Sequence, residues 1–128
     1  LNTDLADICE ASIDGTLNRI SVDRSTKNCI GVVLVSGGYP GNYLKGLPIS
    51  GLNDVDDDVL LFHGGTQFVS DGLVEHIATN GGRVLTIVGS GGTLEVLREK
   101  VYRNVQCIDF EGMYYRKDIA QVDRSAVM

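Results

Sequence analysis

A short polar stretch, N-G-G-R at residues 80–83, combines residue types that bind phosphate groups. Arg83 carries a planar, permanently charged guanidinium that can donate two parallel hydrogen bonds to a phosphate. Gly81 and Gly82 have no side chain, so a ligand can approach their backbone N–H groups closely. Arg83 also opens the run R-V-L-T-I-V (83–88), which places it at the start of a predicted strand. The stretch therefore predicts a phosphate contact or, as the simpler alternative, an ordinary surface arginine.

His63 ends another apolar run, V-L-L-F-H at residues 59–63, and is followed by G-G-T. A histidine at the rim of a sheet can face a cleft and change its charge near neutral pH. A histidine that is simply hydrogen-bonded to a neighbour is the alternative, and the sequence leaves both open. Neither His63 nor His76 has a second ligand at metal spacing, so we expect no metal site built from this chain alone.

A glycine-rich loop, V-S-G-G-Y-P-G-N-Y-L-K-G at residues 35–46, follows a run of strand-forming residues. Glycine loses more conformational freedom on ordering than any other residue, so a loop with this composition needs a reason in the backbone. That reason is positive φ angles or the close approach of another group to the main chain. The loop is therefore either a tight connection or a binding surface.

The elements that must position these residues follow from periodicity. Apolar residues spaced 3, 4 and 8 apart predict a helix near residues 3–17 with Thr3 as its cap. Its apolar stripe consists of Leu5, Ile8, Cys9, Ile13 and Leu17. Thr93 is predicted to cap a second helix near residues 93–104, with Leu94, Leu97, Val101 and Val105 on one face.

Strands are predicted at residues 29–35, 59–63 and 83–88, with a further strand pair across residues 66–88 and a last short strand at 107–110. Asp71 with Gly72 is a hairpin turn signal, and Asn80, Gly81 and Gly82 form a second one. The acidic stretch S-G-L-N-D-V-D-D-D (50–58) is expected to be a solvated connection, although a partner-binding loop is the alternative. The predicted fold class is thus α+β with mostly antiparallel strands.

Composition excludes several classes of protein. A chain of 128 residues fits one domain, and its net charge of −6 argues against binding to a nucleic-acid backbone. Three cysteines without C-x-x-C spacing, two of them in apolar periodic runs, are expected to be reduced and packed, as in a cytoplasmic protein. No apolar run is long enough for a membrane helix. Because the chain begins at Leu1 rather than Met, we expect a piece of a longer protein.

The stretch T-I-V-G-S-G-G-T-L-E-V (86–96) has the strand, glycine cluster and helix start that can bind a dinucleotide. The dinucleotide fingerprint requires a third glycine where Leu94 stands, and only one such strand-helix unit is visible. We therefore favour a simple turn into a helix capped by Thr93.

Five blocks in a fixed order carry a family resemblance, and their sequences are V-V-L-V-S-G-G-Y-P-G-N-Y-L-K-G-L-P-I-S-G-L, L-F-H-G-G-T, T-N-G-G-R-V-L-T-I-V, G-T-L-E-V-L-R-E-K-V-Y and I-D-F-E-G-M-Y-Y-R-K-D-I. Together they resemble the C-terminal domain of the glycinamide ribonucleotide synthetases, which are ATP-grasp ligases of purine biosynthesis. The resemblance implies an incomplete barrel-sandwich hybrid (a rudiment single hybrid motif) with flanking helices. It also implies that the glycine-rich loop is a family feature rather than an incidental turn.

The resemblance further implies a reaction in which ATP and magnesium activate glycine for attack by phosphoribosylamine. The family's G-D-P-E signature near the metal is not in this sequence, so ATP and magnesium are expected to bind mainly to domains that precede this one. This domain would close the site and contact phosphoribosylamine, with no catalytic residue of its own. The expected substrate contacts are Arg83 with Asn80, Gly81 and Gly82 for the phosphate, then Lys45, Tyr39 and Tyr43, and also His63 and Thr66.

The same resemblance divides the chain into a helix and linker at residues 1–20, the ligase domain at 21–119, and a tail or linker at 120–128. Fusion to later purine enzymes is possible, as in eukaryotic members of the family. An alternative is a small barrel-sandwich binding module, or an anion-binding domain, without catalysis. Biotinyl and lipoyl modules carry a Lys at a tight hairpin, which the turns at Gly72 and Gly81 lack.

Overall fold

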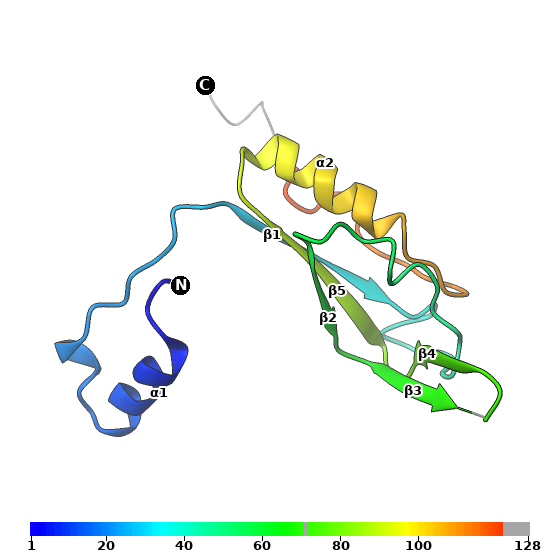
Figure 1. Cartoon of the computed structure of the whole chain (residues 1–128), viewed down its shortest axis with the longest axis horizontal. Helices are drawn as coiled ribbons and strands as arrows, with labels where there is room; N and C mark the ends of the chain where they lie inside the picture. The colour runs from blue at the N-terminus through cyan, green and yellow to red at the C-terminus, as the bar shows by residue number, and fades with distance from the viewer. Residues whose placement is uncertain (71, 122–128) are drawn as a thin grey trace.

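A computed structural model describes residues 1–70 and 72–121, and Figure 1 shows their arrangement. The elements in chain order are α1 (Leu5–Ile13), the 3₁₀ helix η1 (Leu17–Arg19), β1 (Cys29–Val35), β2 (Leu60–His63), β3 (Thr66–Ser70), β4 (Glu75–Thr79), β5 (Arg83–Ser90) and α2 (Leu94–Val105). Strands pair in a three-stranded sheet of order β1-β5-β2 and a two-stranded sheet of β3 and β4. All of these pairs are antiparallel, which confirms the predicted α+β class with mostly antiparallel strands.

The three-stranded sheet is covered by α2 on one side only (Figure 1). Along β1, buried residues alternate with exposed ones, and Ile30, Val32 and Leu34 point to the α2 side. Gly89 of β5 allows α2 to approach, because a Cβ at this position would lie 2.7 Å from Val101 of the helix. The core between sheet and helix is formed by Ile30, Val32, Leu34, Ile49, Val59, Val84, Leu85, Ile87, Leu97, Val101, Val105, Ile108 and Phe110.

Helix α2 agrees with the sequence prediction. The Thr93 side chain accepts a hydrogen bond from the Val96 N–H at 3.4 Å, as an N-cap does. Leu97, Val101 and Val105 are buried on the predicted face. Leu94, in the first turn of the helix, is an exception at 38% exposure.

The predicted hairpin between residues 66–79 and 83–88 is wrong at its second turn. β4 pairs with β3, whereas β5 pairs with β1 and β2, so residues 80–82 carry the chain from one sheet to the other. The glycines of two connections make this crossing possible, since a Cβ on Gly81 would lie 3.1 Å from the Cα of Gly65. The first predicted turn falls partly on Asp71, which lies outside the described residues, and the strands on either side of it do pair antiparallel.

The N-terminal helix differs from its prediction in cap and length. Asp4 rather than Thr3 caps it, accepting from the Ala6 N–H at 2.8 Å. Thr3 instead accepts from the Asp23 N–H at 2.7 Å, and this bond ties the start of the chain to the following segment. α1 ends at Ile13, and the predicted stripe is mostly exposed, with Ile13 at 84%. Figure 1 shows α1 apart from the sheets, joined to β1 by an extended segment.

Two further expectations need correction. Residues 107–110 do not form a strand but make a single bridge, from Asp109 to Ser50, because the chain turns on either side of it. The cysteines are free as expected, but Cys9 and Cys29 are exposed rather than packed, since α1 has no cover and Cys29 lies on the side of β1 away from α2. The predicted tail at residues 120–128 lies outside the described part of the chain except for residues 120 and 121. No helix within residues 1–70 and 72–121 has the length and apolar character needed to cross a membrane.

Candidate functional site

A cleft of about 560 Å³ brings together six of the nine predicted site residues: Tyr39, Tyr43, Asn80, Gly81, Gly82 and Arg83. We call it the glycine cleft, and it is completed by Val33, Gly64, Gly65, Leu85 and Thr86. Its volume lies within the range of about 300 to 1,000 Å³ that is typical of small-molecule sites. No carboxylate is among its lining residues, so Arg83 is the charged group in its wall.

The glycine-rich loop is held at one end by the connection before β5 and at the other by the end of β4. Ser36, which is buried, donates from its hydroxyl to the Gly81 carbonyl and from its N–H to the Gly82 carbonyl, both at 2.8 Å. At the other end, the Leu47 N–H donates to the Thr79 hydroxyl at 3.1 Å. The loop is therefore a fixed connection, and its Tyr39 and Tyr43 also line the cleft.

Two glycines show why this wall requires residues without side chains. A Cβ on Gly82 would overlap the ring of Tyr39, so the ring rests directly on the backbone at Gly82. Gly38 has a φ of +92°, and a Cβ there would overlap the carbonyl oxygen of Asn42. Tyr39 also lies 6.3 Å from Tyr43 between ring centroids, which joins the two aromatic side chains in one wall.

A β-bulge turns Arg83 toward the cleft. The register between β1 and β5 shifts between Leu34, opposite Leu85, and Val35, opposite Arg83. Strict alternation from Leu85 would place Arg83 on the α2 side, whereas the extra residue Val84 is fully buried and Arg83 is exposed. Bulges commonly re-aim a side chain in this way.

The hydrogen-bond donors around Arg83 have no partner among the described residues. Within residues 1–70 and 72–121, the Arg83 side chain makes no hydrogen bond or ion pair, and the N–H groups of Gly81 and Gly82 donate to no other residue. The Asn80 side chain is also without a hydrogen bond in this part of the chain. A guanidinium, an amide and two backbone N–H groups, all of kinds that bind anions, thus belong to residues that line the same cleft.

The structure does not bring Lys45, His63 and Thr66 into the glycine cleft. His63 is opposite Leu85 and so faces away from Thr86, and its Nδ1 lies 3.0 Å from the Thr66 hydroxyl oxygen. This is the local hydrogen bond that the simpler alternative describes. Lys45 is exposed on the outer part of the loop and does not line the cleft.

A second cleft of about 340 Å³ adjoins the first and shares Val33, Tyr39 and Arg83 with it. We call it the tyrosine cleft, because Tyr114 and Tyr115 form its other wall with Arg116 and Ile119. Arg116 is paired with Asp118 at 2.5 Å, and this hydrogen bond raises the pKa of Arg116 and lowers that of Asp118. This segment belongs to the last of the five family blocks, but its residues are not among the predicted site residues.

The described residues offer little to a metal or a dinucleotide. No group of three or more His, Cys, Asp and Glu side chains in residues 1–70 and 72–121 could hold a metal ion. The turn before α2 is closed on Asn28, which accepts from the Gly91 N–H at 2.9 Å and donates from its side chain to Gly92 at 2.7 Å.

Comparison with known proteins gives the same family throughout. The family described as "Phosphoribosylglycinamide synthetase, C domain" matches residues 29–122. A phosphoribosylamine-glycine ligase of Caldanaerobacter subterraneus is 43% identical over 120 residues, and the match covers 94% of this chain and 28% of that protein. A bifunctional purine biosynthetic protein of Dictyostelium discoideum is 42% identical over 123 residues, covering 94% of this chain and 15% of that protein.

A crystal structure of the phosphoribosylamine-glycine ligase of Thermotoga maritima is similar with a TM-score of 0.65 at 30% sequence identity. The similarity covers 86% of this chain and 27% of that structure. The chain therefore spans between a seventh and just over a quarter of the length of these proteins.

Proposed function

The chain belongs to the phosphoribosylglycinamide synthetase C-domain family, and from this premise we propose that it is the C-terminal part of an ATP-dependent ligase. This enzyme would join glycine to 5-phosphoribosylamine, giving glycinamide ribonucleotide in purine biosynthesis. The observation that carries the proposal is the 43% identity to a phosphoribosylamine-glycine ligase over 94% of the chain. The incomplete barrel-sandwich hybrid predicted for this domain is part of the same proposal, in the form of two open sheets.

The glycine cleft would bind the phosphate of phosphoribosylamine. Arg83 would donate two hydrogen bonds to the phosphate oxygens, and the N–H groups of Gly81 and Gly82 would donate from the adjacent backbone. Asn80 would supply one further donor from its side-chain amide. Tyr39 and Tyr43 would form the wall beside the ribose. Lys45, His63 and Thr66 would have at most an indirect role, because they lie outside this cleft.

ATP and magnesium would bind mainly outside this domain. The described residues contain no acidic cluster suited to magnesium, and the glycine turn before α2 is occupied by its own bonds to Asn28. When bound elsewhere in the ligase, ATP would supply the phosphoryl group that activates the glycine carboxylate. The residues of this chain would bind and orient the amine substrate and exclude water from it.

A cytoplasmic location is supported by the three free cysteines, which persist in reducing compartments. The complete protein could also carry another purine enzyme in the same chain, since the Dictyostelium relative is named as bifunctional.

The test is an assay of ADP release by the complete protein that contains this domain. We expect release to require glycine and phosphoribosylamine together and to be matched by glycinamide ribonucleotide. The purified 128-residue chain should release no ADP above background, because the groups that would bind ATP lie outside it. Release without phosphoribosylamine, or turnover by the chain alone, would contradict the proposed function.

A further inference from the structure

One face of the three-stranded sheet is covered by α2, and the other is uncovered within the described residues. Side chains alternate between the two faces along each strand, and the register places Gly31 opposite Val88 and Val33 opposite Thr86. On the other side of β5, Leu60 is opposite Val88 and Phe62 is opposite Thr86. We call this surface the open face, and it consists of Cys29, Gly31, Val33, Leu60, Phe62, Thr86, Val88 and Ser90.

The open face is apolar, whereas the solvated face of an antiparallel sheet is usually polar. Leu60 is 58% exposed, Phe62 is 54% exposed and Val33 is 39% exposed. It carries no charged side chain. Gly31, which has no side chain, leaves the neighbouring Val88 accessible. A Cβ at residue 31 would lie 3.5 Å from a methyl carbon of Val88. Contiguous apolar surface of this kind marks an interaction site.

The open face runs directly into the two clefts. Val33 and Thr86 line the glycine cleft beside Arg83, and Gly31 and Val33 line the tyrosine cleft. A body that packs against Leu60, Phe62 and Val33 would therefore lie beside the clefts and could close the side on which Arg83 is exposed.

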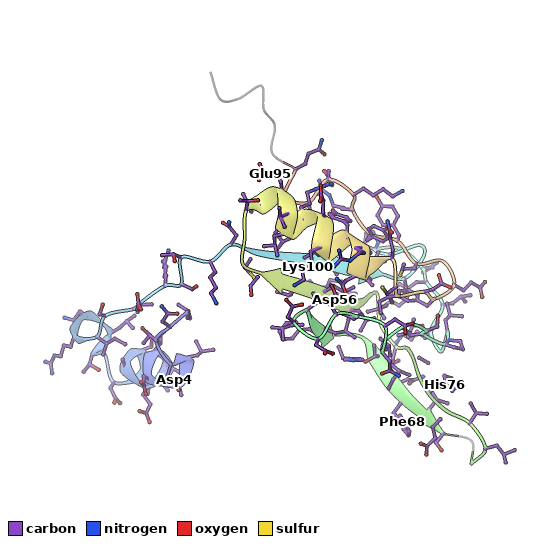
Figure 2. All side chains as sticks on the ribbon, turned by 45° about the horizontal axis from the view of Figure 1, so that its top comes forward. Asp4, Asp56, Phe68, His76, Glu95 and Lys100 are labelled. Carbon is purple, nitrogen blue, oxygen red and sulfur yellow. The ribbon has the colours of Figure 1, made fainter. Side chains whose placement is uncertain are left out.

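The size of the relatives indicates what covers this face. This chain matches only 28% of the Caldanaerobacter ligase, so most of such an enzyme lies outside it. The family match begins at residue 29, but the ligase match covers 94% of the chain and so extends into the segment that carries α1. That helix exposes Leu5 at 63% and Ile13 at 84%, as expected for an element that packs against residues outside this chain. Figure 2, turned from the first view, again shows the helix that begins after Asp4 apart from the sheet that α2 covers.

We propose that the open face is the interface on which the rest of the ligase chain docks, so that the Arg83 cleft lies at the seam between this domain and that larger part. The inference rests on the proposed function, because it takes its occupant from the ligase relatives. Docking would bury apolar surface and at the same time bring groups from the larger part to the substrate bound at Arg83.

Two matched cysteine variants of the complete ligase test the interface. Leu60→Cys places a thiol on the open face, and Val96→Cys places one on the outer surface of α2, where the native residue is similarly exposed at 63%. Alkylation with iodoacetamide is followed peptide by peptide, so that labelling of the native Cys9, Cys29 and Cys107 is measured separately from that of the introduced thiol. If the rest of the chain covers the open face, the thiol at residue 60 should react roughly tenfold more slowly or more, because labelling then waits for the interface to open.

Equal rates at the two positions, after normalisation to the unfolded protein, would overturn the proposal. Protection at residue 60 that disappears on dilution, together with a dimer that dissociates, would also overturn it, because the occupant would be a second copy. ADP release measured on the same samples separates this inference from the proposed function. An active ligase with an unprotected residue 60 would contradict the interface alone, whereas a protected residue 60 in a monomer without ligase activity would support the interface and contradict the function.

Discussion

Two arginines on adjoining clefts differ in whether a carboxylate of the described residues already pairs with them. Arg116 of the tyrosine cleft already has a carboxylate partner in Asp118, which offsets its charge. Arg83 of the glycine cleft has no such partner in the described residues, and two free backbone N–H groups lie beside it. An incoming phosphate would therefore have to displace Asp118 to bind Arg116, but would displace no carboxylate of the described residues to bind Arg83. This difference is our reason for assigning the phosphate to Arg83.

Gly82 offers a test of the cleft that leaves every charge in place. A Cβ at this position would overlap the Tyr39 ring, so Gly82→Ala should push the ring into the cleft. We expect kcat/KM of the complete ligase for phosphoribosylamine to fall roughly ten- to hundredfold, since small misplacements of binding groups have effects of this size. The measurement is steady-state kinetics with varied phosphoribosylamine.

Gly64→Ala is the matched control in the same cleft. Its Cβ would be 3.4 Å from the nearest atom, the Arg83 carbonyl oxygen, and would meet no side chain. We expect near-normal kinetics. Equal losses in the two variants would show that the position of Tyr39 does not matter.

For single residues, the sequence predicted which ones line the cleft better than it predicted how their side chains are oriented. N-G-G-R and the two loop tyrosines do share a cleft, because backbone glycines and aromatic side chains pack there. The bulge at Val84 could not be predicted, since it depends on how β5 pairs with a strand about fifty residues earlier. Without the bulge, Arg83 would have faced α2. His63 failed as a cleft residue because strand alternation turned it the other way.

Helix α2 and the sheet meet at a point where no side chain fits. Gly89 lies under Val101 and Leu97, and a Cβ there would be 2.7 Å and 3.0 Å from their methyl carbons. Gly89→Ala should therefore destabilise the domain by about 1 to 3 kcal/mol, the usual effect of overpacking a core. Urea denaturation followed by circular dichroism would measure it.

Gly31→Ala is the control on the neighbouring strand. Its Cβ would point to the open face at an ordinary distance of 3.5 Å from Val88. The stability of this variant in the 128-residue chain should be unchanged or slightly raised, because alanine loses less backbone freedom than glycine in a strand. A destabilisation as large as that of Gly89→Ala would mean that helix packing is not the cause.

The acidic connection before β2 is not simply solvated, as the sequence suggested, but is bonded to α2. The side chain of Asn104, which is buried, accepts from the Asp56 N–H at 2.7 Å and donates to its carboxylate at 3.0 Å. Arg103 donates to the same carboxylate at 2.8 Å, and Lys100 pairs with Asp58. Figure 2 labels Lys100 on α2 and Asp56 below it, on the connection that faces the helix. The charges of this loop thus fix it to the domain.

This contact makes stability depend on pH. The hydrogen bonds from Asn104 and Arg103 lower the pKa of Asp56 below its ordinary value of 3.8. A carboxylate with a lowered pKa stabilises the folded state fully above the unfolded pKa, and its contribution is lost as the pH falls through the folded value. We therefore expect Asp56→Ala to lose less stability than the native chain on acidification from about pH 6 to about pH 2.

Denaturant titrations at each pH would measure this, with Asp57→Ala as the control, since Asp57 is exposed and makes no side-chain bond to the described residues. Every variant is expected to retain part of the loss of stability in acid, because Arg116 lowers the pKa of Asp118 in all of them. An Asp56→Ala variant with the native pH dependence would contradict the assignment.

Elements with strong periodicity were predicted well, and pairing between them was not. The spacing of Leu97, Val101 and Val105 is a local signal, and α2 follows it. The turn at residues 80–82 looks like a hairpin locally, but β5 finds its partners in β1 and β2 instead of β4. The choice between those partners depends on burial of Leu85 and Ile87 under α2, which no local pattern records.

For the whole molecule, the central fact is that the chain spans just over a quarter of the ligases it resembles. An apolar open face, an exposed α1 stripe and a cleft with free donors are all understandable in a part that works against a larger body. The sequence predicted this dependence through family resemblance. It could not predict the open face, because the register that aligns Leu60, Val88 and Gly31 is visible only in the folded sheet.

The most direct test is the kinetics of Arg83→Ala in the complete ligase. Because charge-assisted hydrogen bonds contribute about 1.5 to 3 kcal/mol, kcat/KM for phosphoribosylamine should fall roughly 10- to 150-fold, mainly through KM. The KM values for ATP and glycine should stay nearly unchanged. Arg83→Lys should recover only part of the loss, since an ammonium lacks the two-pronged geometry.

Lys45→Ala is the control, because it removes a positive charge from the same region but from outside the cleft. We expect Lys45→Ala to lower kcat/KM for phosphoribosylamine less than Arg83→Ala does. The melting temperatures of all three variants should be close to that of the native enzyme. A loss of ATP affinity in Arg83→Ala, an early-melting protein with unaltered kinetics, or a larger effect of Lys45→Ala would contradict the account.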